Sequence, residues 1–151
     1  MGTYRDLDAW KEARVLCKMV YRITELFPDS ERFGLSSQMQ RAAVSILSNI
    51  AEGYGREGAK KYIRFLHISC GSAYELETQI IICNDLGYLD KEQATKLYEK
   101  NTVVIKLLRG FIRSLMKRQG VSLREPVEEY GGNTLDSDCL SNQIFNSKKP
   151  D

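Results

Sequence analysis

The chain has 151 residues, of which 42% are hydrophobic and 28% charged, and its formal net charge is +2. This is ordinary composition for one soluble domain with a hydrophobic core. The longest apolar runs, residues 80–83 and 103–105, fall far short of the roughly 20 residues of a membrane helix, which excludes an integral membrane protein. Residues 1–6 contain no apolar signal segment, so we expect a cytoplasmic protein with no membrane partner.

Charge is divided unequally along the chain. Residues 1–118 carry 19 Lys or Arg and 14 Asp or Glu, a difference of +5, whereas residues 119–151 carry 3 and 6, a difference of −3. A mildly basic domain is compatible with a polyanion partner but does not require one. Sequence-independent binding of nucleic acid depends on how the positive charges cluster.

Two amphipathic helices are predicted in the first third of the chain. The first opens at Asp6 or Asp8 and ends before Pro28. Its apolar face is predicted to hold Trp10, Ala13, Cys17, Val20, Ile23 and Phe27. The second follows a break at Gly34, takes Ser36 as its N-cap and extends to about residue 52. Its apolar stripe consists of Leu35, Met39, Ala42, Ala43, Ile46 and Ile50.

A polar stripe borders the apolar stripe of the second helix. Its members recur at three- and four-residue steps and are Gln38, Arg41, Ser45, Asn49 and Glu52. Such a border suits a second protein surface or a polyanion, and it is equally compatible with a solvated helix flank. We treat the stripe as a candidate oligomer interface, together with the aromatic residues Trp10 and Tyr74.

The third helix is predicted from about residue 59 to residue 85. Its apolar face holds Tyr62, Leu66, Ser69, Ala73, Leu76, Ile80 and Cys83. The middle of this helix is built of small residues, namely Ser69, Gly71, Ser72 and Ala73. A glycine inside a helix costs about 1 kcal/mol relative to alanine. We therefore predict that a neighbouring backbone comes close at Gly71 and that leucine there would force the helices apart.

The fourth helix has the clearest boundaries. Gly87 is predicted to close the third helix, and Asp90 with Gln93 resembles a capping box that opens the fourth. The apolar face of the fourth helix holds Ala94, Leu97, Val104, Leu108, Phe111 and Leu115, and the pattern ends near residue 120. No segment alternates with the period of a strand, so no sheet is predicted.

These elements predict an all-α protein, an antiparallel up-down four-helix bundle over residues 1–118. The polar, acidic segment 119–151 is expected to be a largely disordered tail. The alternative for that tail is a short docking helix carrying Leu140, Ile144 and Phe145.

Catalytic and metal-binding patterns are poorly represented. Residues 53–58 match the dinucleotide glycine fingerprint but follow a predicted helix instead of a strand, which favours an interhelical connection with glycine at positive φ. His67 is the only histidine and has no nucleophile near it in sequence. The four cysteines, Cys17, Cys70, Cys83 and Cys139, are scattered, which indicates reduced thiols and no zinc site. We expect no enzyme activity, catalytic residue, metal or cofactor.

Basic residues cluster on two helices. A row within roughly 80° of the fourth helix's circumference consists of Lys106, Arg109, Arg113 and Lys117, with Arg118 beside its end. A second cluster at the start of the third helix consists of Arg56, Lys60, Lys61 and Arg64. Tyr54 and Tyr62 lie in the same region and are candidates for stacking on unpaired bases. These cations are the predicted nucleic-acid-binding residues, and the alternative is a pair of solvated helix faces.

Several segments of the chain together resemble one protein family. The segment Ser48-Asn49-Ile50-Ala51-Glu52-Gly53, with residues 34–38, 41–43, 65–66 and 71–79, resembles the bacterial four-helix-bundle family named for proteins encoded in 23S rRNA intervening sequences. That family includes the accessory variability protein of diversity-generating retroelements. The resemblance covers about the first 118 residues. One departure is Leu47, where the family usually has proline, so the resemblance does not extend to a helix kink there.

The resemblance implies a homopentamer that works with a reverse transcriptase and its RNA. We therefore expect a non-catalytic, ring-like homo-oligomeric scaffold or adaptor. Its expected partners are further copies of itself and RNA or DNA, or a nucleoprotein such as a retroelement reverse transcriptase. The alternative is a protein-interaction module with no nucleic-acid role.

Overall fold

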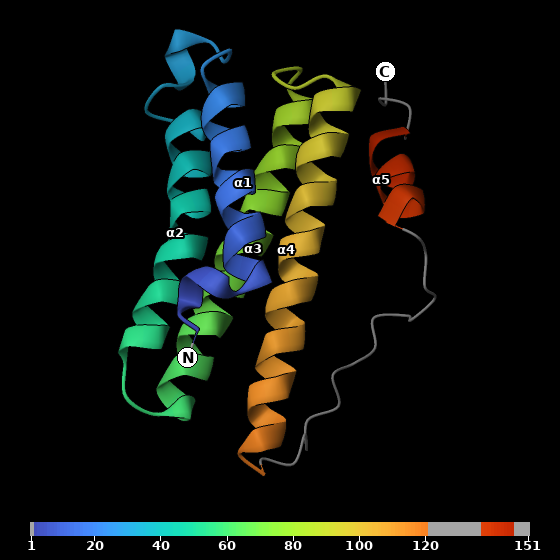
Figure 1. Ribbon diagram of the computed structural model, residues 1–151. Coiled ribbons are helices and arrows are strands. Elements are labelled where there is room, and N and C mark those ends of the chain that lie inside the picture. The colour runs from blue at the N-terminus through green and yellow to red at the C-terminus, as the bar shows by residue number, and fades with distance from the viewer. Residues whose placement is uncertain (1, 121–136, 147–151) are drawn as a thin grey trace.

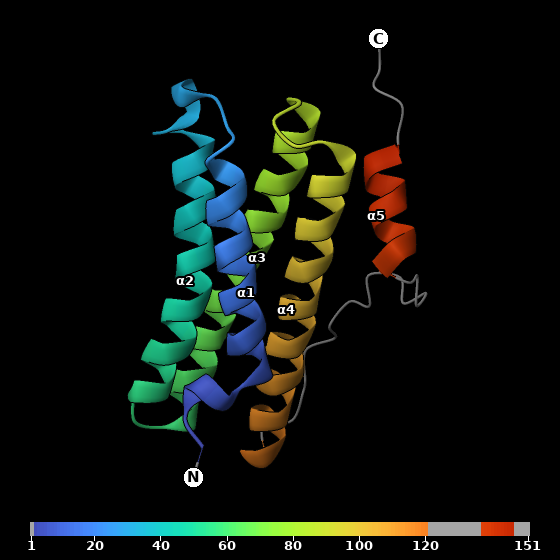
Figure 2. The same ribbon diagram turned by 45° about the horizontal axis from the view of Figure 1, so that its top comes forward.

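Four long helices form the body of the protein in the computed structural model, which describes residues 2–120 and 137–146. They are α1 (Asp8–Thr24), α2 (Leu35–Gly55), α3 (Ala59–Asp85) and α4 (Lys91–Arg118); the described residues also include the helix α5 (Ser137–Asn146) and the 3-10 turns η1 (Tyr4–Asp6) and η2 (Asp29–Glu31). Each long helix packs on the next, and α4 packs on α1 (Figures 1 and 2). The predicted all-α, up-down bundle is confirmed.

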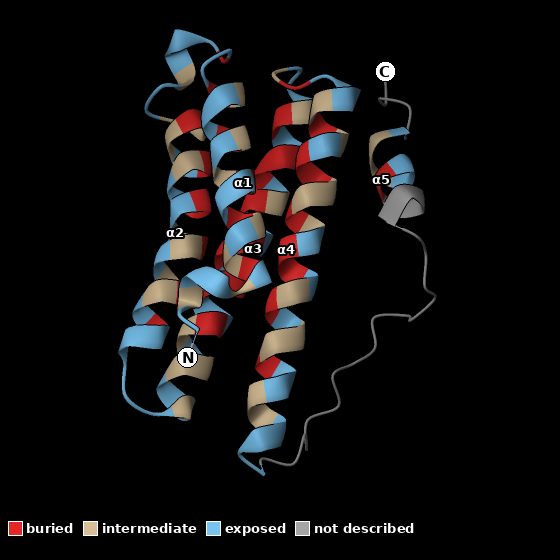
Figure 3. Cartoon of the chain, in the orientation of Figure 1, coloured by how far each residue is buried: buried red, intermediate tan, exposed pale blue. Residues whose placement is uncertain are grey.

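The core lies where the four helices turn their apolar faces toward one another, as the buried positions in Figure 3 show. The stripes predicted for α2 and α3 are buried, except that Leu35 and Tyr62 are half-buried at their ends. The face of α1 is rotated from the prediction, because its buried centre is Leu16 and Val20. The predicted Trp10, Cys17 and Ile23 lie half-buried at the margins of that face.

Two buried side-chain hydrogen bonds tie neighbouring helices together. The Ser69 hydroxyl of α3 donates to the Ile46 carbonyl of α2 at 2.8 Å. The Asn101 amide of α4, fully buried, donates to the Ala73 carbonyl of α3 at 2.8 Å. A short side chain at Ser69 and at Ala73 lets the neighbouring helix come within reach of such bonds. The prediction that α3 has a small-residue packing surface is therefore confirmed for these positions.

The prediction for Gly71 is wrong. Gly71 is exposed, and a Cβ atom built on it would meet no atom within 4 Å. The helical phase that turns Ser69 and Ala73 inward turns Gly71 outward. The close approach is at Gly53, where a Cβ atom would lie 2.7 Å from Cβ of Phe65 and 2.8 Å from Cδ2 of Tyr62.

Gly53 also lies inside α2, which continues to Gly55 instead of ending near residue 52. In the 53–58 segment, positive φ occurs at Gly58 alone, at 96°. Within the glycine fingerprint, Gly53 thus permits close packing near the end of α2, and Gly58 is the residue that makes the turn.

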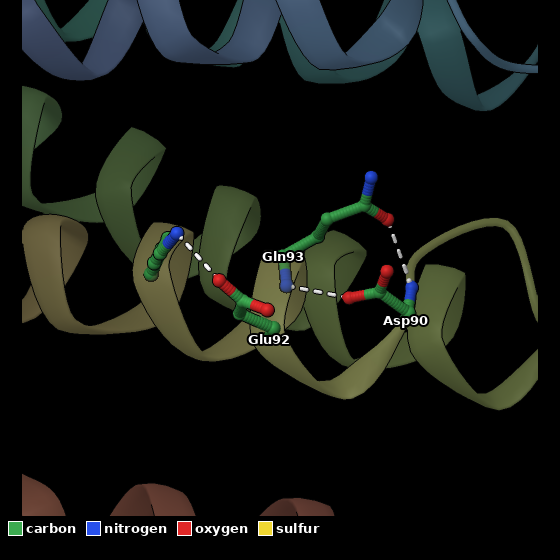
Figure 4. Close-up of polar contacts among 4 residues, drawn as sticks. Asp90, Glu92 and Gln93 are labelled. Atoms are coloured by element: carbon green, nitrogen blue, oxygen red, sulfur yellow. Dashed lines mark hydrogen bonds and ion pairs between the residues drawn. The ribbon is translucent and has the colours of Figure 1, made fainter.

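Helix ends follow the predicted chemistry at α4 and depart from it at α2. The Gln93 backbone donates to the Asp90 carboxylate at 2.8 Å, and the Asp90 backbone donates to the Gln93 side chain at 3.0 Å (Figure 4). Gly87, at φ 79°, closes α3 as predicted. Ser36 does not cap α2, because it is buried inside the helix and the Glu31 carboxylate accepts the Leu35 N–H at 3.0 Å.

Part of the acidic tail forms α5, which packs on α4 and α3 (Figures 1 and 2). The Phe145 ring meets the Tyr98 ring edge-on at a centroid distance of 5.6 Å, and the Lys91 ammonium donates to the Asn146 amide oxygen. For residues 137–146, the alternative of a docking helix replaces the expected disorder. Residues 121–136 and 147–151, and the Leu140 side chain, lie outside what the structure describes.

The close approach at Gly53 gives a first testable prediction. Gly53→Ala should lower the free energy of unfolding by about 1–3 kcal/mol, because the added methyl group overlaps packed atoms of Tyr62 and Phe65. The matched control is Gly71→Ala, which should cause no loss and a gain of up to about 1 kcal/mol. Urea denaturation measures both. Equal effects of the two substitutions would contradict the α2–α3 packing described here.

Docking of α5 gives a second prediction. Phe145→Ala should lower the free energy of unfolding by about 1–2 kcal/mol, because it removes an aromatic pair between α5 and α4. Gln143→Ala, at an exposed position of the same helix, is the control and should have little effect. If thermal denaturation finds the two variants alike, α5 does not contribute to the folded bundle.

Candidate nucleic-acid interface

The two predicted basic clusters lie at the same end of the bundle. Helices α3 and α4 are antiparallel, so the start of α3 and the end of α4 meet at the lower end of Figure 1. The ring of Tyr62 contacts the ring of Phe111 at a centroid distance of 5.6 Å, which fixes the register of the two helices. Lys60 and Arg64 flank Tyr62, and Arg113 follows Phe111, so the two clusters lie level with each other.

All nine predicted nucleic-acid-binding residues are exposed. Arg56 differs from the others, because it forms an ion pair with Glu52 at 2.6 Å and its guanidinium lies 5.6 Å from the Phe65 ring centroid. Arg109 donates to the Tyr74 hydroxyl at 3.3 Å and keeps its charge unpaired. Within residues 2–120, no carboxylate forms an ion pair with the remaining cations, which are Lys60, Lys61, Arg64, Lys106, Arg113, Lys117 and Arg118.

The structure shows a further basic face that was not predicted from the sequence. The outward side of α1 carries four exposed cations at three- and four-residue steps, namely Lys11, Arg14, Lys18 and Arg22. Of these, only Lys11 forms an ion pair with a carboxylate among the described residues, at 3.9 Å from Asp8. The spacing test that found the α4 row would have found this face too. Helix α1, which carries this face, packs directly against α4.

The aromatic residues near the basic end are mostly committed to packing. Edge-to-face contacts link the rings in one chain, with centroid distances from 5.5 to 6.2 Å, in the order Trp10, Tyr4, Tyr54, Tyr62 and Phe111. Burial raises the pKa of Tyr62 to about 12, and its hydroxyl has no hydrogen-bond partner among the described residues. Tyr62 is therefore unsuited to stack on a base. Tyr54, 46% exposed, keeps part of its ring open.

The predicted oligomer stripe is partly a seam within one chain. The Ser45 hydroxyl lies 2.8 Å from the Ser72 hydroxyl of α3, and the Asn49 amide donates to the Ser45 carbonyl at 2.8 Å. Glu52 is paired with Arg56 and Trp10 packs against Tyr4. The exposed members of the predicted interface are Gln38, Arg41, Glu52 and Tyr74. The middle of the stripe thus joins α2 to α3 and has limited capacity to bind another molecule.

The described residues give little support for a reactive thiol, a catalytic histidine or a metal site. Burial raises the pKa of the Cys70 and Cys83 thiols to about 11, so these thiols are protonated and weakly nucleophilic at neutral pH. His67 is exposed on α3. No group of three or more metal-ligating side chains forms within residues 2–120 and 137–146. None of the helices in that part of the chain combines the length and apolar content that a membrane crossing requires.

Comparison with known proteins identifies the family. The fold is similar to a crystal structure of a protein of unknown function from the S23 ribosomal protein family of Bacteroides thetaiotaomicron, with a TM-score of 0.65 and 23% identity over 70% of this chain and 98% of that chain. At that identity, the similarity is evidence for the fold alone. No curated protein sequence matches the chain. Residues 5–110 match the family described as 23S rRNA-intervening sequence protein, and the chain belongs to that family.

Proposed function

We propose that this protein is a non-catalytic, homo-oligomeric scaffold that binds nucleic acid or a nucleoprotein partner through its basic helix faces. The observation that carries the proposal is the α4 row, Lys106, Arg109, Arg113 and Lys117, which is exposed and unpaired with any carboxylate of the described residues. A retroelement reverse transcriptase with its RNA is one such partner, and a ring of five copies is what the family resemblance implies. A cytoplasmic location is part of the proposal.

The geometry of the row suits a phosphate backbone. Lys106 and Lys117 are eleven residues apart, about 16 Å along the helix axis. Four cations over that length can face several phosphates, because duplex DNA carries one charge per about 1.7 Å of its axis. A row of flexible cations with most nearby aromatic rings packed away favours contacts to phosphates over contacts to bases. The expected binding is tolerant of sequence and sensitive to salt.

A protein-interaction module without a nucleic-acid role is the second candidate. The observation that favours it is the apolar exposure at the opposite end of the bundle, where the Leu26 side chain is 72% exposed and the Phe33 side chain 90% exposed. Large apolar side chains in contact with solvent are typical of protein contacts when they form a patch. In that case the role of the basic faces is to keep the protein soluble.

The third prediction tests the α4 row. Wild-type protein should bind structured RNA and duplex DNA more weakly as the salt concentration rises. A plot of log K against log salt concentration should have a slope of about −0.7 to −0.9 for each phosphate contact. Changing Arg109 and Arg113 to Gln should weaken binding to all sequences and flatten the salt slope by about one to two units. Fluorescence anisotropy across salt concentrations measures both quantities.

The control removes the same charge elsewhere. Arg32→Gln with Lys96→Gln changes two cations outside the row, one of them already paired with Glu92 at 2.7 Å, and should leave the salt slope unchanged. A third variant, Arg14→Gln with Lys18→Gln, measures the share of the α1 face. Absence of binding at low salt by an assembled wild-type protein would refute the nucleic-acid proposal and favour the protein-interaction module.

A further inference from the structure

Two connecting segments lie at the end of the bundle opposite the basic clusters (Figures 1 and 2). Residues 25–34 lead from α1 to α2, and residues 85–90 lead from the last turn of α3 to α4. The Tyr88 hydroxyl donates to the Glu31 carboxylate at 3.0 Å, and the centroids of the Phe27 and Tyr88 rings are 5.6 Å apart. These contacts hold the two segments together, and we call the surface that they form the acidic end.

Large apolar side chains of the acidic end are in contact with solvent. Phe33 is 90% exposed, Leu26 is 72% exposed and Leu86 is 56% exposed, and these are the three most exposed large apolar side chains of the described residues. None of the three belongs to the hydrophobic core. Packing within one chain therefore does not account for them. Exposed apolar side chains gathered in this way are typical of a protein contact.

Negative charge accompanies these apolar side chains. The acidic end carries five carboxylates and one cation, Arg32, a difference of −4. Two of the carboxylates have a role within the chain, because Glu31 accepts the Leu35 N–H at the start of α2 and Asp90 caps α4. Two others, Glu25 and Asp85, are exposed and form no ion pair or side-chain hydrogen bond with another described residue.

The positions of Glu25 and Asp85 are unfavourable for a carboxylate. Glu25 directly follows α1, and Asp85 is the last residue of α3. The C-terminal end of a helix carries partial negative charge, so a lysine is favourable there and a carboxylate is not. The stability of the single chain gives no reason for these two charges. A cationic partner is attracted by both of them.

We propose that the acidic end binds a segment of a partner protein in which lysine or arginine residues surround apolar side chains. The apolar side chains of that segment cover Phe33 and its neighbours, and its cations pair with Glu25 and Asp85. Charge complementarity selects this occupant over a polyanion or an anionic membrane. The acidic end and the α4 row lie at opposite ends of the bundle, so this contact does not depend on nucleic-acid binding.

A second copy of the chain is a less suitable occupant. Its acidic end would be repelled, and at its basic end Tyr54 is the one exposed large apolar side chain of the described residues. The outward face of α1 is basic as well, but its exposed apolar side chains are Val15, at 39%, and Tyr21, at 44%. These surfaces offer little apolar area to cover a phenylalanine that is 90% exposed.

Fluorescence anisotropy with a labelled synthetic helical peptide of leucine and lysine tests the proposal. Wild-type protein should bind this peptide, and it should not bind matched peptides in which glutamate replaces lysine or serine replaces leucine. Phe33→Ser should weaken binding at least about tenfold, as should Glu25→Lys combined with Asp85→Lys. Both variants should keep or raise the melting temperature, because Phe33 lies outside the core and lysine is favourable at a helix C-terminus.

Controls of matched chemistry change residues elsewhere in the bundle. Val103→Ser removes an apolar side chain that is 42% exposed on α4, and Glu57→Lys with Glu75→Lys reverses two exposed carboxylates. These variants should retain peptide binding. Equal binding by all variants, or none by the wild type, would overturn the proposal. A fall in the mass of the assembly on Phe33→Ser would also overturn it, because the occupant would then be a second copy.

Peptide binding and RNA binding are measured separately, so that the two proposals can fail independently. Phe33→Ser should leave the RNA affinity and its salt slope unchanged. A wild-type protein that binds the peptide and no RNA would refute the nucleic-acid proposal and retain this one. A wild-type protein that binds RNA and no peptide would do the reverse.

Discussion

The close contact between α2 and α3 is the constraint on which the rest of the structure depends. It is possible because Gly53 has no side chain where Tyr62 and Phe65 pass, and because Ser69 is short enough to bond the Ile46 carbonyl at 2.8 Å. The hydroxyls of Ser45 and Ser72 meet at 2.8 Å along the same seam. This seam fixes the rotation of α3 about its axis, and that rotation decides which residues face solvent.

Placement of charge follows from that rotation and from the antiparallel order of the helices. The basic start of α3 lies level with the basic end of α4, because Tyr62 packs on Phe111. The outward side of α1 carries a third group of cations, which includes Arg14 and Lys18. The bundle thus carries exposed cations on α1, α3 and α4, and these cations are the basis of the proposal that the protein binds polyanions.

Helical periodicity predicts the bundle, the stripes of α2 and α3 and the capping box at Asp90, because each depends on local chemistry. The error at Gly71 is not one of phase. Gly71 is two residues from both Ser69 and Ala73, about 200° of helical rotation, so the periodicity itself places it on the outward side. The mistake was to treat the whole small-residue segment as one packing surface. The exposed cations of the α4 row follow from spacing, as does the overlooked α1 face. The pairing of Ser45 with Ser72 cannot be predicted, because it joins two helices whose relative register depends on packing. Docking of α5 is similarly a matter of tertiary contact.

Lysine acetylation read by mass spectrometry, with and without bound RNA, tests the central claim most directly. If the α4 row contacts phosphates, Lys106 and Lys117 should be protected by RNA, because their ammonium groups lose access to the reagent. Lys91 and Lys96, at the other end of the same helix, should be modified equally in both samples. Equal modification of all four lysines with RNA bound would contradict the account.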